Sequence, residues 1–181
     1  MTTLYLVRHG ETVDNANQIM QGQTQGQLNE NGIKQAQQFS DEWKDKPIDV
    51  IIASDLKRSI DTARIIAEPH NLEVITTPLL RERDWGGFTG RFIPDLKGEV
   101  WPDDIETLEN LLSRAGEFIA YVKQTFPGKE GAGRRPWHHQ QSYTISLLSK
   151  TTERDSEDVE CRSSYTRTLV YLRPPMRLPP E

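Results

Sequence analysis

Leu-Val-Arg-His-Gly-Glu-Thr, residues 6–12, closes the first apolar run of the chain. Residues 3–8 predict a short buried strand, because they are mostly apolar and His9-Gly10 follows them as a boundary. A histidine is therefore expected at the carboxyl end of a strand. A lone histidine in that position is usually structural, so its neighbours decide how it is interpreted.

Strand-like and helix-like segments alternate along the first 130 residues. Residues 48–53 and 72–77 predict two further strands. Helices are expected over residues 29–45, after Ser54-Asp55, and from residue 103 to Pro127-Gly128, because apolar residues recur there at helical spacing. The apolar faces expected to be buried are Ile33, Ala36, Phe39 and Trp43; Leu56, Ile60, Ala63 and Ile66; and Leu108, Leu111, Leu112, Ala115, Ile119 and Val122.

This alternation predicts the α/β fold class, a three-layer sandwich with a largely parallel central sheet flanked by helices. Ligands of such sheets bind in the crevice at the carboxyl ends of the strands. His9 and Ser54-Asp55 each follow a predicted strand, so we expect them at the same edge of the sheet. Asn29 and Ser54-Asp55 are the residues expected to cap the first two helices.

Composition narrows the function classes. The length of 181 residues allows one compact domain, and 35% hydrophobic with 27% charged residues is typical of a soluble globular protein. No run approaches the roughly 20 apolar residues of a membrane span, and the chain enters a strand too early for a signal segment. We therefore expect a cytoplasmic protein without a membrane partner. The net charge of -5 argues against nucleic acid as a partner. Any anion site must therefore be a small cationic pocket rather than a broad basic surface.

Cys161 is the only cysteine, which excludes an intrachain disulfide and a thiolate metal cluster. The spacing of the other possible ligands suggests no metal site either.

The neighbours of His9 suit an oxyanion. Arg8 brings a guanidinium whose fork geometry matches phosphate oxygens, and Gly10 permits close backbone approach. Thr12 and Asn15 add neutral hydrogen-bonding groups without competing negative charge.

Two further segments add charged side chains. Arg58 falls in the first turn of a predicted helix, where a cation is unfavourable against the helix dipole. It is either an exposed arginine on a solvated face or part of an anion site. Glu82 lies between Arg81 and Arg83 and is either a salt-bridge partner or the proton donor that a leaving alkoxide needs.

With these segments in chain order, the sequence resembles the histidine phosphatase superfamily, in the branch of phosphoglycerate mutases and related small phosphatases. The resemblance covers roughly residues 3–130. The matching segments are residues 6–12 with Asn15, Gln21-Gly22, Leu28-Asn29-Glu30-Asn31-Gly32, Ser54-Asp55-Leu56-Lys57-Arg58 with Thr62-Ala63, and Leu80-Arg81-Glu82 with Trp85-Gly86. Each segment alone is modest evidence for the family, but the occurrence of all of them in this order argues against coincidence.

The resemblance implies a role for each matching residue. His9 resembles the nucleophile that becomes phosphorylated, and Glu82 resembles the general acid and later base. The substrate-binding set that the resemblance implies is Arg8, Asn15, Gln21, Gly22 and Arg58, with Arg8 and Arg58 as the phosphate clamp and Asn15 as a phosphate hydrogen-bond donor. Such a site needs neither a metal nor another cofactor.

The resemblance fails at the family's second catalytic histidine, which ends an apolar strand as His-Gly. The stretch that should hold it reads Glu-Gly-Ala-Gly-Arg-Arg-Pro-Trp-His-His-Gln-Gln, residues 130–141. No apolar strand is recognisable there. His138 and His139 are poor substitutes, because neither follows a Val-rich run or precedes a glycine.

A shifted reading frame accounts for this departure. Tryptophan is encoded only by TGG and histidine only by CAC or CAT, so reading Trp137-His138 one nucleotide later yields a glycine codon. Pro136 encoded as CCA would then become histidine, and residues 131–135 can become Val-Leu-Val-Val-Val. We hypothesise that residues from about Glu130 are translated out of frame.

The predicted organisation is therefore a histidine phosphatase-like α/β domain at residues 1–130 and an atypical, weakly structured tail at residues 131–181. The tail holds five of the eleven prolines, and only residues 143–148 and 168–172 could form strands. The C-terminal strand and helix of the family are expected to be missing or non-native.

Three functions remain open from the sequence. The first is hydrolysis of a phosphomonoester on a small soluble metabolite, impaired if the second histidine is missing. The second is phosphoglycerate mutase activity; the short stretch between Glu82 and the long helix favours a phosphatase instead, one that resembles the alpha-ribazole phosphatases. The third is non-catalytic phosphate binding. The sequence does not indicate the oligomeric state.

Overall fold

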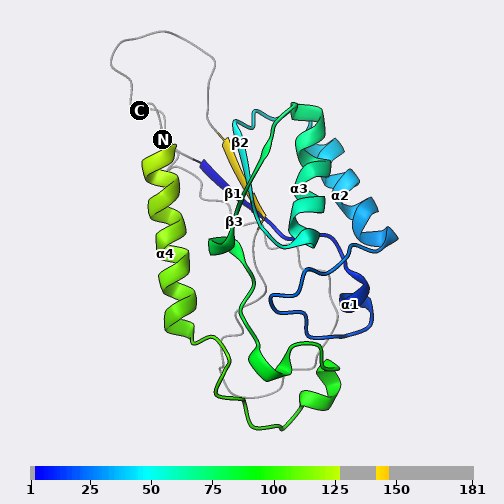
Figure 1. Ribbon diagram of the computed structural model, residues 1–181. Coiled ribbons are helices and arrows are strands. Elements are labelled where there is room, and N and C mark those ends of the chain that lie inside the picture. The colour runs from blue at the N-terminus through cyan, green and yellow to red at the C-terminus, as the bar shows by residue number, and fades with distance from the viewer. Residues whose placement is uncertain (1–2, 127–141, 147–181) are drawn as a thin grey trace, which may run out of the picture.

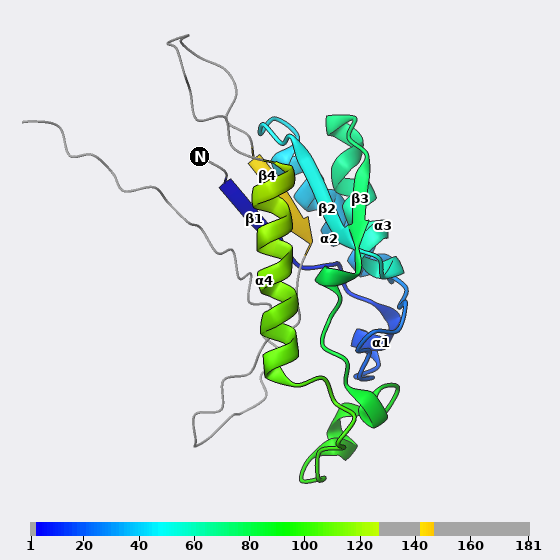
Figure 2. The same cartoon turned by 60° about the vertical axis from the view of Figure 1, so that its left-hand side comes forward.

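The computed structural model describes residues 3–126 and 142–146. Its core is a four-stranded sheet in the order β1-β4-β2-β3, and every strand pairing is parallel (Figure 1). The strands are β1 (Thr3–Val7), β2 (Val50–Ser54), β3 (Val74–Thr77) and β4 (Ser142–Ser146). Helix α4 covers one face, and α2 and α3 cover the other (Figure 2). The predicted α/β sandwich with a parallel sheet is confirmed.

The strand β4 lies at the centre of the sheet. It pairs with β1, with Val7 opposite Ser146, and also with β2, with Ile52 opposite Ile145. β4 overlaps the strand expected at residues 143–148, so a segment assigned to the atypical tail supplies a central strand. The predicted domain boundary and the remainder of the tail lie outside the described residues.

Two helices pack side by side on one face of the sheet. Helix α2 (Glu30–Trp43) begins after Asn29, whose side chain accepts a hydrogen bond from the Gly32 amide at 2.8 Å. Helix α3 (Lys57–Ala67) lies beside it. Ser40 of α2 donates a hydrogen bond from its Oγ to the Ile65 carbonyl of α3. The buried residues shared by this face are Ile51, Ala53, Ala63, Ile66 and Ala67. Both helices were expected at these places.

Two details of this layer differ from the predictions. Ile33 was expected in the core but is exposed, because the buried stripe of α2 runs through Gly32, Ala36, Ser40 and Trp43. Ser54-Asp55 was expected to cap α3, but Leu56 is the N-cap and no side chain caps it. Ser54 Oγ instead accepts from the Leu56 amide at 3.1 Å, which shapes the turn before the helix.

Helix α4 (Leu108–Thr125) starts later than predicted, because Thr107 is the residue that caps it. Phe118 and Val122 of this helix share a buried core cluster with Ile52 of β2 and with Leu80. Leu108, Leu112, Ala115 and Ile119 were expected on the buried face and are exposed. The expected stripe is wrong for these four and right for Leu111 and Val122, which are buried together with Phe118.

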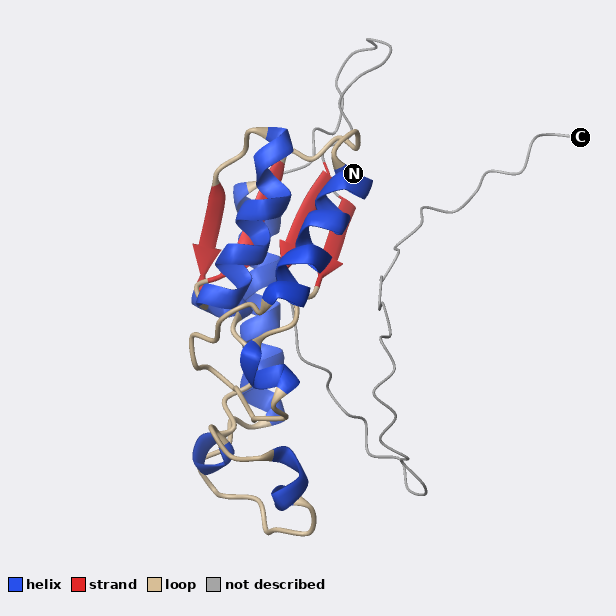
Figure 3. Cartoon of the chain, turned by 90° about the vertical axis from the view of Figure 1, so that its right-hand side faces the viewer, coloured by secondary structure: helices blue, strands red, loops and turns tan. Residues whose placement is uncertain are grey.

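Loops with short helices extend beyond the carboxyl ends of the strands (Figure 3). They include α1 (Val13–Ala16) and the 3-10 turns η2 (Pro78–Leu80), η3 (Gly86–Phe88) and η4 (Ile93–Leu96), while η1 (Glu68–His70) follows α3. Isolated bridges from Thr12 to Leu28 and from Ile19 to Phe92 join these loops. Within the described ranges, no helix has the length and apolar character needed to cross a bilayer.

Candidate active site

His9 lies just past the end of β1, and its two ring nitrogens have different partners. Nδ1 is 2.7 Å from the Gly10 carbonyl oxygen, so the proton belongs on Nδ1 and Nε2 keeps its lone pair. Burial lowers the pKa of His9 to about 4, and the charges of Arg58 and Arg8 act in the same direction against the Gly10 hydrogen bond. The ring is therefore neutral near pH 7, as a nucleophile must be.

The backbone beside His9 is held by a contact between two glycines. A Cβ on Gly10 would lie 2.3 Å from the Gly32 carbonyl oxygen, and a Cβ on Gly32 would lie 2.0 Å from the Glu11 carbonyl oxygen. The amide of Gly10 donates to Thr62 Oγ1 at 3.1 Å, and that hydroxyl donates to the Arg58 carbonyl. The turn after β1 is thus fixed to both α2 and α3.

Arg58 is buried, with 1% of its side chain exposed, so the exposed-arginine alternative is wrong. Its Nε donates to His9 Nε2 at 3.2 Å, and its Nη2 donates to Glu82 Oε2 at 2.9 Å. The carbonyls of Gly22 and Thr24 accept from Nη2 and Nη1 at 2.8 and 2.5 Å. The guanidinium therefore connects the histidine to the carboxylate.

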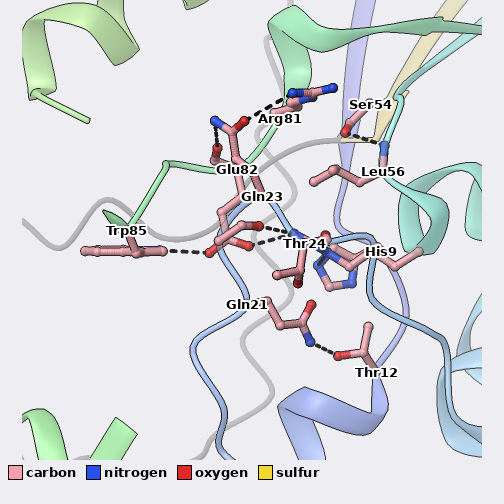
Figure 4. A network of polar contacts seen from close by, with 12 residues as sticks. His9, Thr12, Gln21, Gln23, Thr24, Ser54, Leu56, Arg81, Glu82 and Trp85 are labelled. Atoms are coloured by element: carbon pink, nitrogen blue, oxygen red, sulfur yellow. Dashed lines mark hydrogen bonds and ion pairs between the residues drawn. The ribbon is translucent and has the colours of Figure 1, made fainter. Parts of the chain in front are cut away.

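Glu82 is half-buried, in a segment without regular secondary structure. Its second carboxylate oxygen accepts from Trp85 Nε1 at 3.2 Å (Figure 4). Arg58 and Trp85 together fix both carboxylate oxygens of Glu82. His9, Arg58 and Glu82, which are far apart in the sequence, therefore form one hydrogen-bonded group.

The remaining predicted residues surround this group. Gln21 is buried; its Nε2 donates to Thr12 Oγ1 while its Oε1 has no partner among the described residues. Gly22 has a φ of +53° and turns its carbonyl to Arg58. Arg8 is exposed and forms no ion pair with any described residue.

Asn15 has a structural task that sequence analysis missed. Its Oδ1 accepts from the Thr12 amide at 3.2 Å, and its own amide donates to Thr12 Oγ1 at 3.0 Å. This reciprocal capping box starts α1. The Nδ2 group has no partner in the described part of the chain and is the part of Asn15 that could donate to a ligand.

Sequence analysis also assigned no role to an ion pair at the edge of the site. Arg81 donates to both carboxylate oxygens of Asp55, at 2.7 and 2.5 Å. These hydrogen bonds lower the pKa of Asp55. The pair ties the end of β2 to the segment that carries Glu82. Both residues stood in quoted motifs, but nothing in the motifs indicated their pairing.

No cluster of three or more histidine, cysteine, aspartate or glutamate residues with metal-binding geometry occurs within residues 3–126. The site is built from a neutral imidazole, a buried guanidinium and a carboxylate, which are groups suited to phosphoryl transfer.

Comparison with known proteins decides the family. Residues 4–132 match the model of the histidine phosphatase superfamily, branch 1. The chain belongs to this superfamily. The expected resemblance over residues 3–130 is thereby confirmed.

Among its relatives, the "uncharacterized phosphatase PhoE" of Bacillus subtilis is 39% identical over 134 residues, which cover 72% of this chain and 69% of PhoE. The "probable phosphoglycerate mutase GpmB" of Proteus mirabilis is 45% identical over 103 residues, or 56% of this chain and 48% of GpmB. The chain thus matches about half the length of GpmB.

Solved structures agree on the fold. The alpha-ribazole phosphatase from Shigella flexneri superposes with a TM-score of 0.65 at 26% identity, covering 80% of this chain and 73% of that one. YhfR of Bacillus stearothermophilus has a TM-score of 0.69 at 23% identity, covering 82% and 74%, and so supports the fold alone.

For a histidine phosphatase, the sequence beside β1 is unusual. A strand that ends in His-Gly and pairs with β1 would bring its histidine next to His9. β4 has that place in the sheet, but it is Ser-Tyr-Thr-Ile-Ser and is followed in the sequence by Leu147-Leu148-Ser149. The alternatives His138 and His139 lie outside the described residues.

Proposed function

We propose that this chain derives from a phosphomonoester hydrolase that acts through a phosphohistidine on His9. The observation that carries this proposal is the buried Arg58 guanidinium, which contacts His9 Nε2 and the Glu82 carboxylate together. A buried cation beside a neutral imidazole is suited to hold a phosphate for attack. The names of the relatives support the reaction class. The substrate that we propose is a small phosphorylated metabolite, and the cytoplasm is the location expected from the sequence.

The proposed reaction has two steps. First, His9 Nε2 attacks phosphorus and the bond to the ester oxygen breaks; that oxygen takes a proton from the acid form of Glu82 and leaves as an alcohol. Second, the Glu82 carboxylate takes a proton from water, whose oxygen attacks phosphorus. The bond from phosphorus to nitrogen breaks, its electron pair returns to Nε2, and inorganic phosphate leaves. Arg58 and Arg8 stabilise the equatorial oxygens in both steps.

Turnover by the present chain is proposed to be impaired. No histidine follows β4 in the sequence, and the described residues place no second histidine beside His9, so we propose that one donor to the phosphate is missing. Removal of one such donor typically costs on the order of 100-fold in rate or more. A shifted reading frame from about Glu130 remains our hypothesis for this loss.

The test compares the present chain with its frame-restored version. Sequencing the gene around codons 128–138 shows whether a single-base shift restores a Val-rich strand ending in His-Gly. Hydrolysis of p-nitrophenyl phosphate should then be on the order of 100-fold faster for the restored chain. Equal rates for the two chains would contradict the impairment, and the absence of any such shift would contradict the frameshift hypothesis.

Phosphoglycerate mutase is the second candidate because of the identity to GpmB. A mutase needs priming by 2,3-bisphosphoglycerate, so a coupled assay with and without this compound separates the two activities. Phosphate binding without catalysis is the third candidate, and it predicts that labelled substrate leaves no phosphoryl group on His9.

A further inference from the structure

The segment that carries Glu82 is held by side chains rather than by secondary structure. Residues 81–85 belong to no helix or strand. Nevertheless Glu82 must keep its carboxylate within reach of the leaving oxygen, because general acid catalysis needs hydrogen-bond distances. Some other part of the molecule must therefore fix this backbone.

Arg114 of α4 supplies most of that support. Its Nη1 donates to the carbonyls of Leu79 and Arg81 at 3.0 and 2.9 Å, and its Nη2 donates to the Glu82 carbonyl at 3.4 Å. Its Nε and Nη2 also donate to the Glu106 carboxylate at 2.7 and 2.8 Å. These bonds use all five N–H groups of a guanidinium, so Arg114 has none left for a substrate anion.

Glu106 holds the other end of the same segment. Its Oε2 accepts from the Asp84 amide at 3.1 Å, and its own amide donates to the Asp84 carbonyl at 2.9 Å. Its backbone carbonyl accepts from Arg83 Nε at 2.8 Å. Hydrogen bonds from Arg114 and Asp84 lower the pKa of Glu106 although burial opposes them.

Helix α4 gives this pair a rigid base. Phe118, one turn after Arg114, packs in the same buried cluster as Leu80, which lies at the start of the Glu82 segment. The side chains of Arg114 and Glu106 are only 20% and 11% exposed, so water competes little for their hydrogen bonds.

We propose that Arg114 and Glu106 are positioning residues for Glu82, and that α4 thereby sets the place of the proton donor. This inference rests on the proposed role of Glu82. Arg114 acts through the backbone of the segment and does not touch the substrate.

The first test does not depend on turnover. The Trp85 indole N–H donates to the Glu82 carboxylate, so its NMR resonance, assigned with Trp85→Phe, reports where that carboxylate lies. Arg114→Met and the milder Arg114→Lys should both move this resonance in the full chain. Arg91→Met is the matched control. It removes an exposed arginine that donates two hydrogen bonds to the Glu99 carboxylate and does not contact the Glu82 segment.

Thermal unfolding of each variant shows that it is folded. An unchanged Trp85 resonance in a folded Arg114→Lys chain would overturn the proposal, whatever the enzymatic result. A shift of equal size in Arg91→Met would overturn it as well.

The second test uses the chemistry of the leaving group. An alkyl phosphate needs a proton donor, whereas 2,4-dinitrophenyl phosphate does not. Arg114→Lys should slow phosphorylation of His9 by the alkyl phosphate roughly tenfold more than phosphorylation by the dinitrophenyl compound. Equal slowing would indicate a general structural role and contradict positioning. If neither the unsubstituted chain nor its frame-restored version labels His9, the proposed function is wrong, and the Trp85 resonance still decides the role of Arg114.

Discussion

At the scale of single residues, the site depends on how each ionisable group is paired. His9 is kept neutral by burial and by two nearby arginines, while the Gly10 carbonyl fixes its proton on Nδ1. Arg58 is charged and buried, and Glu82 compensates that charge. The proposed nucleophile and the proposed anion clamp are therefore already in contact in the structure without substrate.

The low pKa of His9 makes stability depend on pH. The unfolded chain binds a proton at His9 below its ordinary pKa of 6.5, whereas the folded chain resists protonation down to about 4. Lowering the pH from 7 to 5 should therefore remove roughly 2 kcal/mol of unfolding free energy through His9. Urea unfolding at both pH values, compared with His9→Gln, measures this. Equal pH dependence in the two chains would contradict a depressed His9 pKa.

Arg58 and its neighbour Lys57 offer a matched pair of substitutions. Arg58→Lys keeps the charge but cannot contact His9, Glu82 and the two carbonyls together, so His9 phosphorylation should fall on the order of 100-fold. Lys57→Met removes an exposed cation paired with Asp61 and should change the rate less than twofold. An unchanged rate in Arg58→Lys together with a loss in Lys57→Met, measured by single-turnover labelling, would show that only the local positive charge matters.

At the scale of elements, contacts between loops and helices set the geometry of the site. The Gly10 turn packs backbone against backbone on the first turn of α2, which is why Gly32 has no room for a side chain. Sequence analysis recognised both glycines as parts of motifs. It could not reveal that they touch, because their contact joins segments that are separated by a long loop.

A helical glycine elsewhere provides the comparison for this contact. Gly32→Ala should destabilise the fold by roughly 2 kcal/mol or more, because the added methyl group meets the backbone of Glu11. Gly116→Ala in α4 meets nothing within 4 Å and should stabilise the fold by about 0.5–1 kcal/mol. Chemical denaturation of both variants is the measurement. A neutral Gly32→Ala would show that the close contact is easily relieved.

The limits of sequence reasoning also appear at this scale. The strand ends, α2 and α3 could be predicted because their periodicity is strong. In α4, the sequence offers two apolar stripes, and the exposed Leu112 was expected inside while the buried Phe118 was not assigned. The Arg114–Glu106 pair was also missed, since its residues flank the start of the helix and match no local motif.

At the scale of the whole molecule, the described residues form the α/β body of a histidine phosphatase, and a strand from the segment predicted to be an atypical tail lies inside its sheet. The motifs predicted this family and indicated that His9, Arg58 and Glu82 belong to one site. Residues 143–148 were named as a possible strand, but the central place of β4 could not be predicted, because its strand signals are weak and it pairs with strands far away in the sequence. The residues of the candidate site that the structure describes all lie within residues 3–126.

Phosphorylation of His9 itself tests this account most directly. The full chain and His9→Gln are incubated with a phosphorus-32-labelled alkyl phosphate, quenched in base, where phosphohistidine survives, and analysed by peptide mass spectrometry. The account predicts an acid-labile phosphoryl group on His9 that is absent from His9→Gln. Labelling of both chains to the same extent, or no label on His9 in either the present or the frame-restored chain, would contradict it.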